Sequence, residues 1–264
     1  MSTTAEPDAD AGGGAALRLR LDGPIARITL CRPAKYNVLS AATIAALQAA
    51  LSEAGADPQV RVIVLGAEGR AFSAGHDLNE MGADRDIEAM RTLFRACGDL
   101  MLTIRRLGQP VIARVQGVAT AAGCQLVAMC DLAVASSEAR FAVSGINLGL
   151  FCATPAVPLS RNMLQKPALE MLLTGDFIDA ATARERGLVN RVAAPGQLDA
   201  EVDALAGAIA AKSPAAIAAG KRLFYEQREL PIAAAYGQAA DVMADNAVHA
   251  DARSGIAKFT RRER

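Results

Sequence analysis

Apolar and polar residues alternate at the start of the chain and predict a β-hairpin. The stretch from Leu17 to Cys31 alternates in this way and is interrupted by Asp-Gly-Pro, which is typical of two strands joined by a tight turn. Ser40 then precedes an Ala- and Leu-rich segment with helical spacing. Ser40 is therefore the expected N-cap of a helix that ends near Gly55.

Strand and helix patterns continue to alternate along the first half of the chain. The β-branched run VRVIVLGA predicts a buried strand. After it come a long helix from about Ile87 to Leu107, the strand PVIARVQG, a helix from Ala121 to Met129 and the strand DLAVAS. Repetition of this kind predicts an α/β core in which neighbouring units stack.

Beyond Leu164 the pattern changes to Ala-rich helical segments such as PAAIAAGKRLFYEQ. We therefore divide the chain into a disordered, acidic and Gly-rich stretch at residues 1–14, an α/β core at residues 15–200, and a helical C-terminal section at residues 201–264. The apolar faces of the C-terminal helices suit either a core or a subunit interface.

The overall composition limits the classes of function. The formal net charge is +0, so no net field attracts nucleic acid or an anionic membrane, and RNA binding is disfavoured. The longest apolar stretch, Val111 to Ala135, contains Arg114 and Asp131 and is too polar for a membrane helix. The 5 cysteines show neither a Cys-x-x-Cys pair nor zinc-like spacing, which predicts reduced thiols in a cytoplasmic protein without a metal site.

Two loops contain signals for backbone N–H groups that face a ligand. In RAFSAGHDL, Gly75 permits a bend that turns a peptide N–H outward, although an ordinary strand-to-loop glycine gives the same pattern. In VQGVATAAGCQL, Thr120 is the expected N-cap of a helix whose first N–H groups, those of Ala121, Ala122 and Gly123, lie at its positive end. One donor from each loop would form an oxyanion hole for a thioester that becomes an enolate.

The order of these motifs resembles that of the enoyl-CoA hydratase/isomerase superfamily, also called the crotonase superfamily. AFSAGHDL and VQGVATAAGCQL are similar to its two signature loops, and CRPAKYNVLS is similar to its first CoA-binding loop. The resemblance runs from about Leu17 to the C-terminus. It implies a crotonase-like spiral of ββα units with a C-terminal helical section, an acyl-CoA substrate without a further cofactor, and a homotrimer or dimer of trimers assembled through residues 201–264.

The resemblance also implies roles for individual residues. The N–H groups of His76 and Ala122 take the positions of the oxyanion donors, and the Ala74 carbonyl takes that of the acceptor for the adenine amino group. The remaining substrate-binding positions fall on Lys35, Arg70, Asp77, Leu78, Lys258 and Phe259. Asp77 also suits a structural role as the cap of the turn DLNE, and the basic residues also suit a solvated surface.

Two departures from the family pattern change the expected chemistry. The positions of the two hydratase glutamates hold Gln125 and Gly145, and neither residue can titrate. Since a positioned acid or base contributes about 10² to 10⁴-fold, little hydration is expected. An aspartate position used by other members falls on Ala153. The remaining candidates near the thioester are the His76 ring, Asn147, Cys152 and Glu80.

The sequence therefore predicts an acyl-CoA-processing enzyme of the enoyl-CoA hydratase/isomerase type, which keeps the oxyanion hole but lacks the usual acid and base. The alternative from another class of protein is a non-catalytic acyl-CoA-binding protein. Nothing in the sequence specifies the length or polarity of the acyl group.

Overall fold

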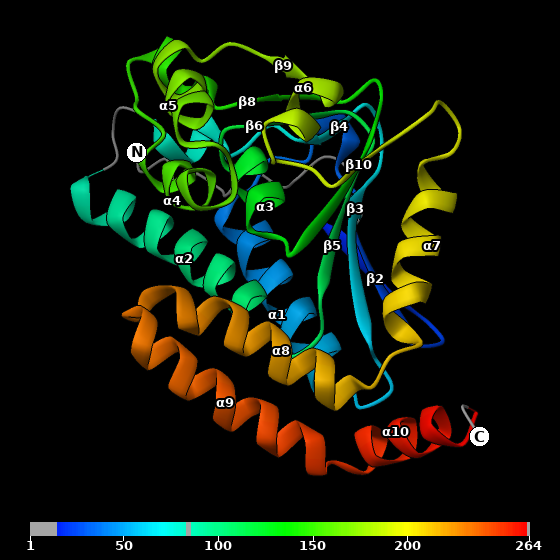
Figure 1. The fold of residues 1–264 in the computed structure, drawn as a ribbon. Coiled ribbons are helices and arrows are strands. Elements are labelled where there is room, and N and C mark those ends of the chain that lie inside the picture. The colour runs from blue at the N-terminus through cyan, green and yellow to red at the C-terminus, as the bar shows by residue number, and fades with distance from the viewer. Residues whose placement is uncertain (1–14, 83–85, 263–264) are drawn as a thin grey trace, which may run out of the picture.

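A six-stranded sheet lies at the centre of the fold (Figure 1). The computed structural model describes residues 15–82 and 86–262, so the prediction of disorder for residues 1–14 lies outside the described residues. The first two strands form the predicted antiparallel hairpin, and the later strands add in parallel. In spatial order the strands are β1 (Leu17–Asp22), β2 (Ile25–Leu30), β3 (Val62–Ala67), β5 (Val111–Val115), β7 (Leu132–Ser136) and β10 (Arg191–Ala193).

A second, four-stranded sheet receives the chain each time it leaves the first. Its strands, in spatial order, are β4 (Ala71–Ser73), β6 (Val118–Thr120), β8 (Arg140–Ala142) and β9 (Ile178–Asp179). The chain passes from β3 to β4, from β5 to β6 and from β7 to β8, and each pair is followed by helical structure. This repeating order agrees with the expected spiral of ββα units. It also places both signature loops directly after strands of the second sheet.

Capping side chains define the starts of the first helices. Ser40 Oγ accepts a hydrogen bond from Thr43 N–H at 3.1 Å, which confirms Ser40 as the N-cap of α1 (Ala41–Ala56). The prediction that Thr120 caps α3 (Ala122–Met129) is wrong, because β6 extends through Thr120 and its backbone pairs with β8. The other helices of this part are α2 (Ile87–Arg106), α4 (Ala153–Asn162), α5 (Gln165–Thr174) and α6 (Ala180–Glu185).

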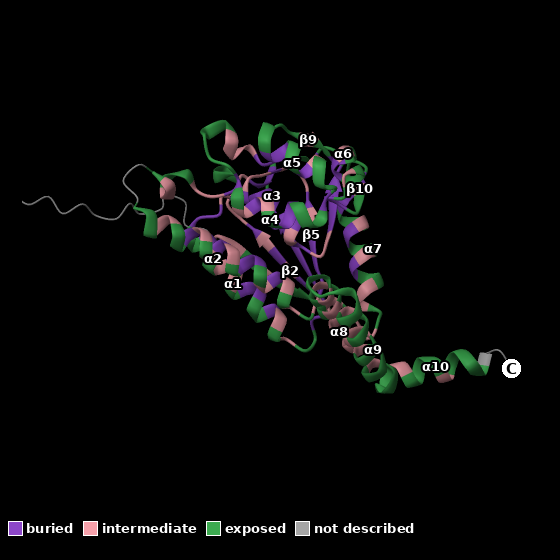
Figure 2. Cartoon of the chain, turned by 60° about the vertical axis from the view of Figure 1, so that its left-hand side comes forward, coloured by how far each residue is buried: buried purple, intermediate pink, exposed green. Residues whose placement is uncertain are grey.

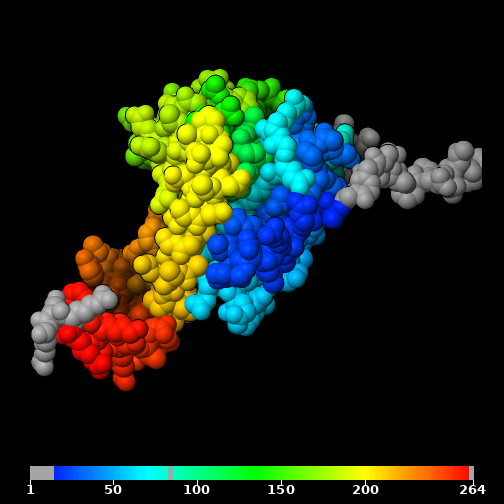
Figure 3. Space-filling view, turned by 90° about the vertical axis from the view of Figure 1, so that its right-hand side faces the viewer, coloured from blue at the N-terminus to red at the C-terminus, as the bar shows by residue number. Residues whose placement is uncertain are grey.

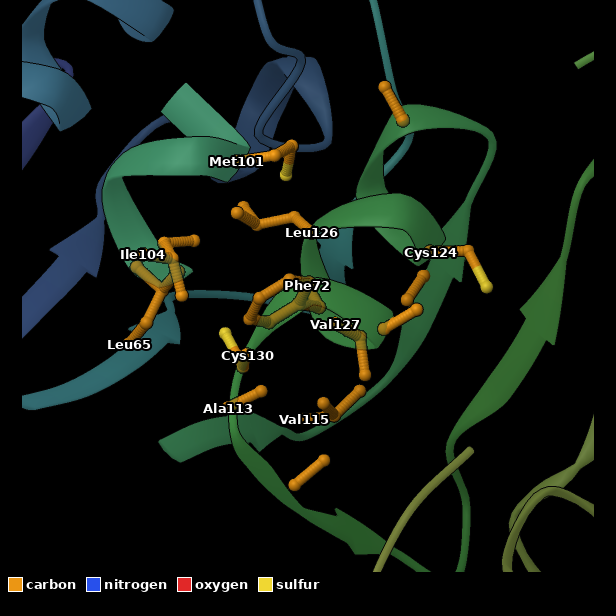
Figure 4. Packing of buried hydrophobic residues seen from close by; sticks show 14 of the residues in the cluster. Leu65, Phe72, Met101, Ile104, Ala113, Val115, Cys124, Leu126, Val127 and Cys130 are labelled. Atoms are coloured by element: carbon orange, nitrogen blue, oxygen red, sulfur yellow. The ribbon is translucent and has the colours of Figure 1, made fainter. Parts of the chain in front are cut away.

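The main hydrophobic core lies between the sheets and helices α1, α2 and α3. Figure 4 shows part of it, where side chains from β3, β4, α2 and α3 meet: Leu65, Phe72, Met101, Ile104, Leu126 and Val127. All five cysteines are free, and four of them are buried, which confirms the prediction of reduced thiols. Burial raises the pKa of Cys124 to about 12, so this thiol packs as a small apolar side chain.

Helix α7 (Leu198–Ala210) covers the opposite face of the six-stranded sheet (Figure 1). One apolar cluster joins the helix to the sheet and contains Val62, Val64, Ile112, Val134, Leu198, Val202 and Ala206. Strand β3 is therefore buried on both faces, which explains its continuous apolar sequence. The helix runs across the predicted boundary between residues 200 and 201.

The C-terminal section consists of α8 (Pro214–Glu226), α9 (Ile232–Val248) and α10 (Ala250–Arg262). Helix α8 packs beside the end of α2, whereas α9 and α10 project from the body of the molecule and are mostly exposed or half-buried (Figure 2, Figure 3). Within residues 15–82 and 86–262, no single helix is long and apolar enough to cross a membrane. In this part of the chain, α7 and the segment Pro214–Glu229 are long and apolar enough only when they are taken together, and they are bent by 103° relative to each other.

A buried ion pair anchors α8 to the core. Lys221 Nζ lies 2.7 Å from Asp131 Oδ2 and also donates to two backbone carbonyls near the end of α2. Tyr225 OH donates to Asp131 Oδ1 at 2.8 Å. The side chains of Lys221 and Asp131 are only 6% and 11% exposed, and burial lowers the pKa of Lys221 while Asp131 opposes this shift. Removal of either partner would therefore leave the other charge buried without its counter-charge.

Lys221→Met is expected to lower the free energy of unfolding by about 3–5 kcal/mol, because the Asp131 carboxylate stays buried without its cation. Chemical denaturation measures this loss. Arg222→Met is the matched control on the next residue, which is exposed, and should change stability by less than about 0.5 kcal/mol. Equal stabilities for the two variants would contradict the anchoring role of Lys221.

Candidate active site

A cavity of about 270 Å³ lies where the two signature loops meet the start of α3. Positions that the sequence singled out line it, among them Ala74, His76, Leu78, Ala122 and Gly145. The loop after β8 and the first turn of α4 also line it, with Leu148, Leu150, Phe151, Cys152, Ala153, Thr154 and Pro155. The structure thus brings segments that are distant in sequence to one mostly apolar cavity, as is usual for small-molecule sites.

Asn37 ties the first signature loop to the strand beneath it. Its side-chain amide donates to the carbonyls of Glu68 and Ala71 at 2.9 and 2.8 Å, and the residue is 1% exposed. Ser73 Oγ donates to Asn37 O at 2.8 Å and accepts from Gly75 N–H at 3.2 Å. These bonds hold the bend at Gly75 in place. Sequence reasoning missed Asn37, because its partners come together only in the folded chain.

Gly75 brings the two signature loops into contact. Its φ is 92°, and an added Cβ would lie 2.8 Å from Ala121 Cβ and 3.0 Å from Ala122 N. Any side chain at this position would therefore push the loops apart. Leu39 and His76 form an isolated parallel β-bridge. In this bridge the Leu39 N–H donates to Gly75 O at 2.7 Å, so the His76 N–H is not used. The two predicted oxyanion donors, the N–H groups of His76 and Ala122, consequently lie beside the contact between Gly75 and the start of α3.

Ala121 has an unusual backbone conformation just before α3. Its φ is 49° and its ψ is −123°, a combination that costs a residue with a side chain about 1–3 kcal/mol. The Ala121 N–H donates to Ala142 O at 3.1 Å, so the expectation that it faces a ligand is wrong. Ala122 is the first residue of α3, and its N–H has no acceptor one turn earlier in the helix.

The two positions of the family glutamates differ in their surroundings. Gln125 lies one helical turn after Ala122, is 2% exposed, and has a buried Oε1 without a hydrogen-bond partner in the described part of the chain. A buried acceptor of this kind costs about 1–3 kcal/mol until a water or ligand donates to it. At Gly145, a Cβ would meet Leu150 O and Cys152 Sγ, each at 2.7 Å. The chain itself fills the space in which a glutamate side chain would begin.

Among the described residues that line the cavity, His76 and Cys152 are the titratable ones. His76 Nδ1 lies 3.3 Å from Leu39 O, which can only accept, so Nδ1 carries the hydrogen and Nε2 keeps its electron pair. Nε2 is buried, and no described residue binds it. Burial lowers the pKa of His76, with the bond to Leu39 and the charge of Glu80 opposing this shift. Burial raises the pKa of the Cys152 thiol, which keeps it protonated at neutral pH.

The other polar candidates lie outside the cavity. Glu80 Oε2 accepts from Ala41 N–H at 2.7 Å and serves the first turn of α1. Asn147 is exposed and does not line the cavity. In the described ranges, no three His, Cys, Asp or Glu side chains gather as metal ligands would. The sequence did not single out Phe94, whose ring packs edge-on against His76 with centroids 5.4 Å apart, because its apolar pattern is that of any core helix.

The predicted CoA-binding residues fall into two groups. The Arg70 guanidinium stacks 4.5 Å from the centre of the Tyr36 ring, so Arg70 is a neighbour of the turn that holds Lys35. Asp77 Oδ1 accepts from Asn79 N–H at 3.0 Å, as expected for the cap of this turn. Lys258 and Phe259 lie on α10, away from the cavity, so a single chain does not bring them to it (Figure 1). The contacts of these residues with CoA stay predictions.

Comparison with known proteins identifies the family. The family model for enoyl-CoA hydratase/isomerase matches residues 20–264, and the chain belongs to this family. It is 41% identical over 240 residues to enoyl-CoA hydratase domain-containing protein 3, mitochondrial, of Rattus norvegicus, a match that covers 91% of this chain and 80% of the rat protein. The word mitochondrial describes that relative, and the cytoplasmic location of this chain stays a prediction.

Solved structures support the same assignment. The crystal structure of an enoyl-CoA hydratase from Mycobacterium smegmatis is 52% identical with a TM-score of 0.92, and covers 94% of this chain and 97% of that one. The crystal structure of human enoyl-CoA hydratase domain-containing protein 3 is 40% identical with a TM-score of 0.92, and the match covers 94% of this chain and 98% of the human one. The expected crotonase-like α/β fold is therefore confirmed, as is the resemblance from which it was inferred.

Ala121→Gly is expected to stabilise the protein by about 1 kcal/mol, because glycine adopts a φ of 49° without a clash of its Cβ. Thermal melting should show a rise in Tm of about 2–4 °C for a chain of this size. Ala128→Gly, in the interior of α3, is the control and should lower the stability by about 1 kcal/mol. If Ala121→Gly lowers the Tm as well, Ala121 is not strained.

Proposed function

We propose that the protein binds an acyl-CoA thioester in the cavity and catalyses proton transfer at the carbon next to the thioester carbonyl. The observation that carries this proposal is that His76 and Ala122, whose backbone N–H groups are the two donors, line one apolar cavity, and that the His76 ring has a buried Nε2 without a partner among the described residues. The family to which the chain belongs includes enoyl-CoA hydratases and isomerases. Coenzyme A enters as part of the substrate, and the proposal includes no separate cofactor.

The oxyanion hole supplies the largest part of the expected catalysis. The thioester oxygen accepts from the N–H groups of His76 and Ala122. When the bond from Cα to hydrogen breaks, its electron pair moves toward this oxygen, and the two donors and the positive end of α3 stabilise the enolate. One donor of this kind contributes about 2.7–4 kcal/mol in enzymes where it has been removed. Lys35, Arg70, Ala74, Asp77 and Leu78 would hold the CoA part of the ligand.

The His76 ring is the base in this proposal. Its hydrogen bond to Leu39 O leaves Nε2 as the acceptor, and its lowered pKa keeps the ring neutral at pH 7. Nε2 takes the proton from Cα and returns it to the enolate. Hydration of a double bond is expected to be slow, since the Gln125 amide cannot transfer a proton and Gly145 has no side chain.

A non-catalytic acyl-CoA-binding protein is the second candidate. It is favoured by the lining of the cavity, in which the described residues include no carboxylate. The two candidates differ in one measurable property, which is whether bound acyl-CoA exchanges its α protons with solvent.

Butyryl-CoA in D₂O is expected to gain deuterium at its α carbon in the presence of the protein, as measured by mass spectrometry. His76→Ala keeps the backbone N–H but removes the base, and should slow the exchange by about 100-fold. Because burial lowers the pKa of His76, the rate should be constant above about pH 6.5 and fall as the pH drops through the lowered value. Ala122→Pro deletes the second donor and should also cost about 100-fold or more.

Glu80→Gln is the matched control, because its side chain keeps an acceptor for Ala41 N–H and lies outside the cavity. Its exchange rate at pH values above about 6.5, where the His76 ring is neutral with or without the charge of Glu80, should be close to that of the natural protein. Tight binding of butyryl-CoA without any exchange would support the non-catalytic candidate. Rapid hydration of crotonyl-CoA, at about 10 per second or more, would show that another residue supplies an acid and base.

We also propose that the protein is a trimer or a dimer of trimers. Two surfaces expose large apolar side chains that monomers rarely leave in water. One lies on α5 and the segment after it, with Leu169, Leu173 and Phe177 at 51, 59 and 50% exposure. The other lies on α9 and α10, with Tyr236, Met243 and Phe259 at 73, 75 and 65%. In such an assembly, Lys258 and Phe259 of one copy would be available to the site of another.

Light scattering should give a mass of three or six chains of 27.4 kDa. Met243→Glu places a charge on the α9 surface and should dissociate the assembly, since an unpaired charge is costly in an apolar interface. Leu21→Glu on the exposed edge strand β1 is the control and should leave the mass unchanged. A monomeric natural protein would refute the proposed assembly.

A further inference from the structure

A second cavity of about 720 Å³ adjoins the first. Thr154 lines both cavities, and Gln125 lines the second. In Figure 1 the helices that supply its lining, α2, α3, α4 and α8, lie around one region of the molecule. The mechanism proposed above does not use this second cavity.

Helices α2 and α3 each line both cavities with residues of one face. On α2, Phe94 lines the first cavity and Gly98 and Met101 line the second. On α3, Ala122 lines the first, and Gln125 and Met129 line the second. Residues three or four apart share one face of a helix, so the same faces of α2 and α3 lead from the first cavity toward the second. From Ala122 to Met129 this path measures about 10 Å, at 1.5 Å per residue.

The far end of the second cavity is basic. Arg105, Arg161 and Arg228 line it, and Glu229 is the one carboxylate in the described lining. Arg105 Nη2 lies 3.5 Å from Glu229 Oε1. Arg161 donates to Val157 O at 3.1 Å and Arg228 to Arg161 O at 3.0 Å, which are backbone acceptors without a net charge. The described lining thus holds three guanidinium groups and one carboxylate, and that carboxylate pairs with Arg105.

We propose that this cavity binds the distal end of the acyl group and that the preferred acyl group ends in a carboxylate. The inference rests on the proposed function, because the thioester must occupy the first cavity for the chain to reach the second. Guanidinium groups bind carboxylates through paired, charge-assisted hydrogen bonds, and the Arg228 guanidinium lies against the backbone carbonyl of Arg161, so both residues border the same part of the cavity. The apolar middle of the path, with Met101, Met129 and Val157, fits the methylene groups.

Gln125 adds a polar side chain to the apolar middle of the second cavity. Its Oε1 is buried without a partner among the described residues, and because it is an acceptor it needs a donor such as water and not the carboxylate itself. A purely hydrocarbon acyl chain leaves this acceptor unsatisfied. A ligand that carries water or a polar group past this side chain can donate to it.

The test compares acyl-CoA pairs that differ only at the end of the acyl chain. Hexanoyl-CoA is compared with adipoyl-CoA, and octanoyl-CoA with suberoyl-CoA, by calorimetric titration of the full-length protein. In at least one pair, the dicarboxylic ligand should bind about 10- to 100-fold more tightly, which corresponds to a charged hydrogen bond. Arg161→Gln and Arg228→Gln should each remove most of this preference without a change in the affinity for hexanoyl-CoA.

Two further variants separate recognition from general electrostatics and from folding. Arg222→Gln removes the same charge from α8 but outside this cavity, and should leave the preference intact. Glu229→Gln removes the competing carboxylate and should strengthen adipoyl-CoA binding several-fold. This gain would also be measurable if an arginine variant failed to fold.

Equal affinities within both pairs, with hexanoyl-CoA still bound, would overturn this subsite and leave the proposed function standing. A preference that survives Arg161→Gln and Arg228→Gln would also overturn it. If none of the four thioesters binds, the proposed function itself fails, and the subsite with it.

Discussion

The contact between Gly75 and the start of α3 is the constraint on which the candidate site depends. A Cβ at Gly75 would lie 3.0 Å from Ala122 N, so the two loops approach as closely as two backbones can. Asn37 and Ser73 hold this bend from one side with buried hydrogen bonds. Gly123 permits the same closeness from the other side, because a Cβ there would lie 2.3 Å from Ser73 O. The N–H groups of His76 and Ala122, the two proposed oxyanion donors, are therefore brought to the same contact by backbone packing alone.

An oxyanion hole made of backbone N–H groups, as proposed here, does not depend on the side chains around it. The loop from Leu150 to Cys152 occupies the space beside Gly145, and Gln125 has a buried polar side chain that carries no charge. The proposed site would then consist of two backbone donors and one imidazole whose tautomer is set by Leu39. Such a site would suit a reaction in which one proton leaves and returns at one carbon, because burial keeps the Cys152 thiol protonated and leaves His76 as the base.

A chain without net charge can still carry a strongly charged site. Arg105, Arg161 and Arg228 come from α2, α4 and the turn after α8, and they meet at one end of a cavity. The buried pair of Lys221 and Asp131 fixes α8 relative to α2 and so determines where Arg228 lies. The stability of the fold and the proposed recognition of the ligand would thereby be linked through one helix.

Local signals in the sequence determined the elements and the backbone of the site. The hairpin, the Ser40 cap and the buried strand β3 depend on residues a few positions apart, whereas the choice of His76 and Ala122 as donors came from the resemblance of the two loops to the family's motifs. Only the tertiary structure decided the rest: that Thr120 belongs to a strand, that the chain closes over Gly145, and that the His76 ring lies at the cavity with Nδ1 beside Leu39 O and Nε2 buried. The arginines of the second cavity belong to this group as well. Each of these features arises from contacts between segments far apart in the chain, and no local pattern of residues specifies such contacts.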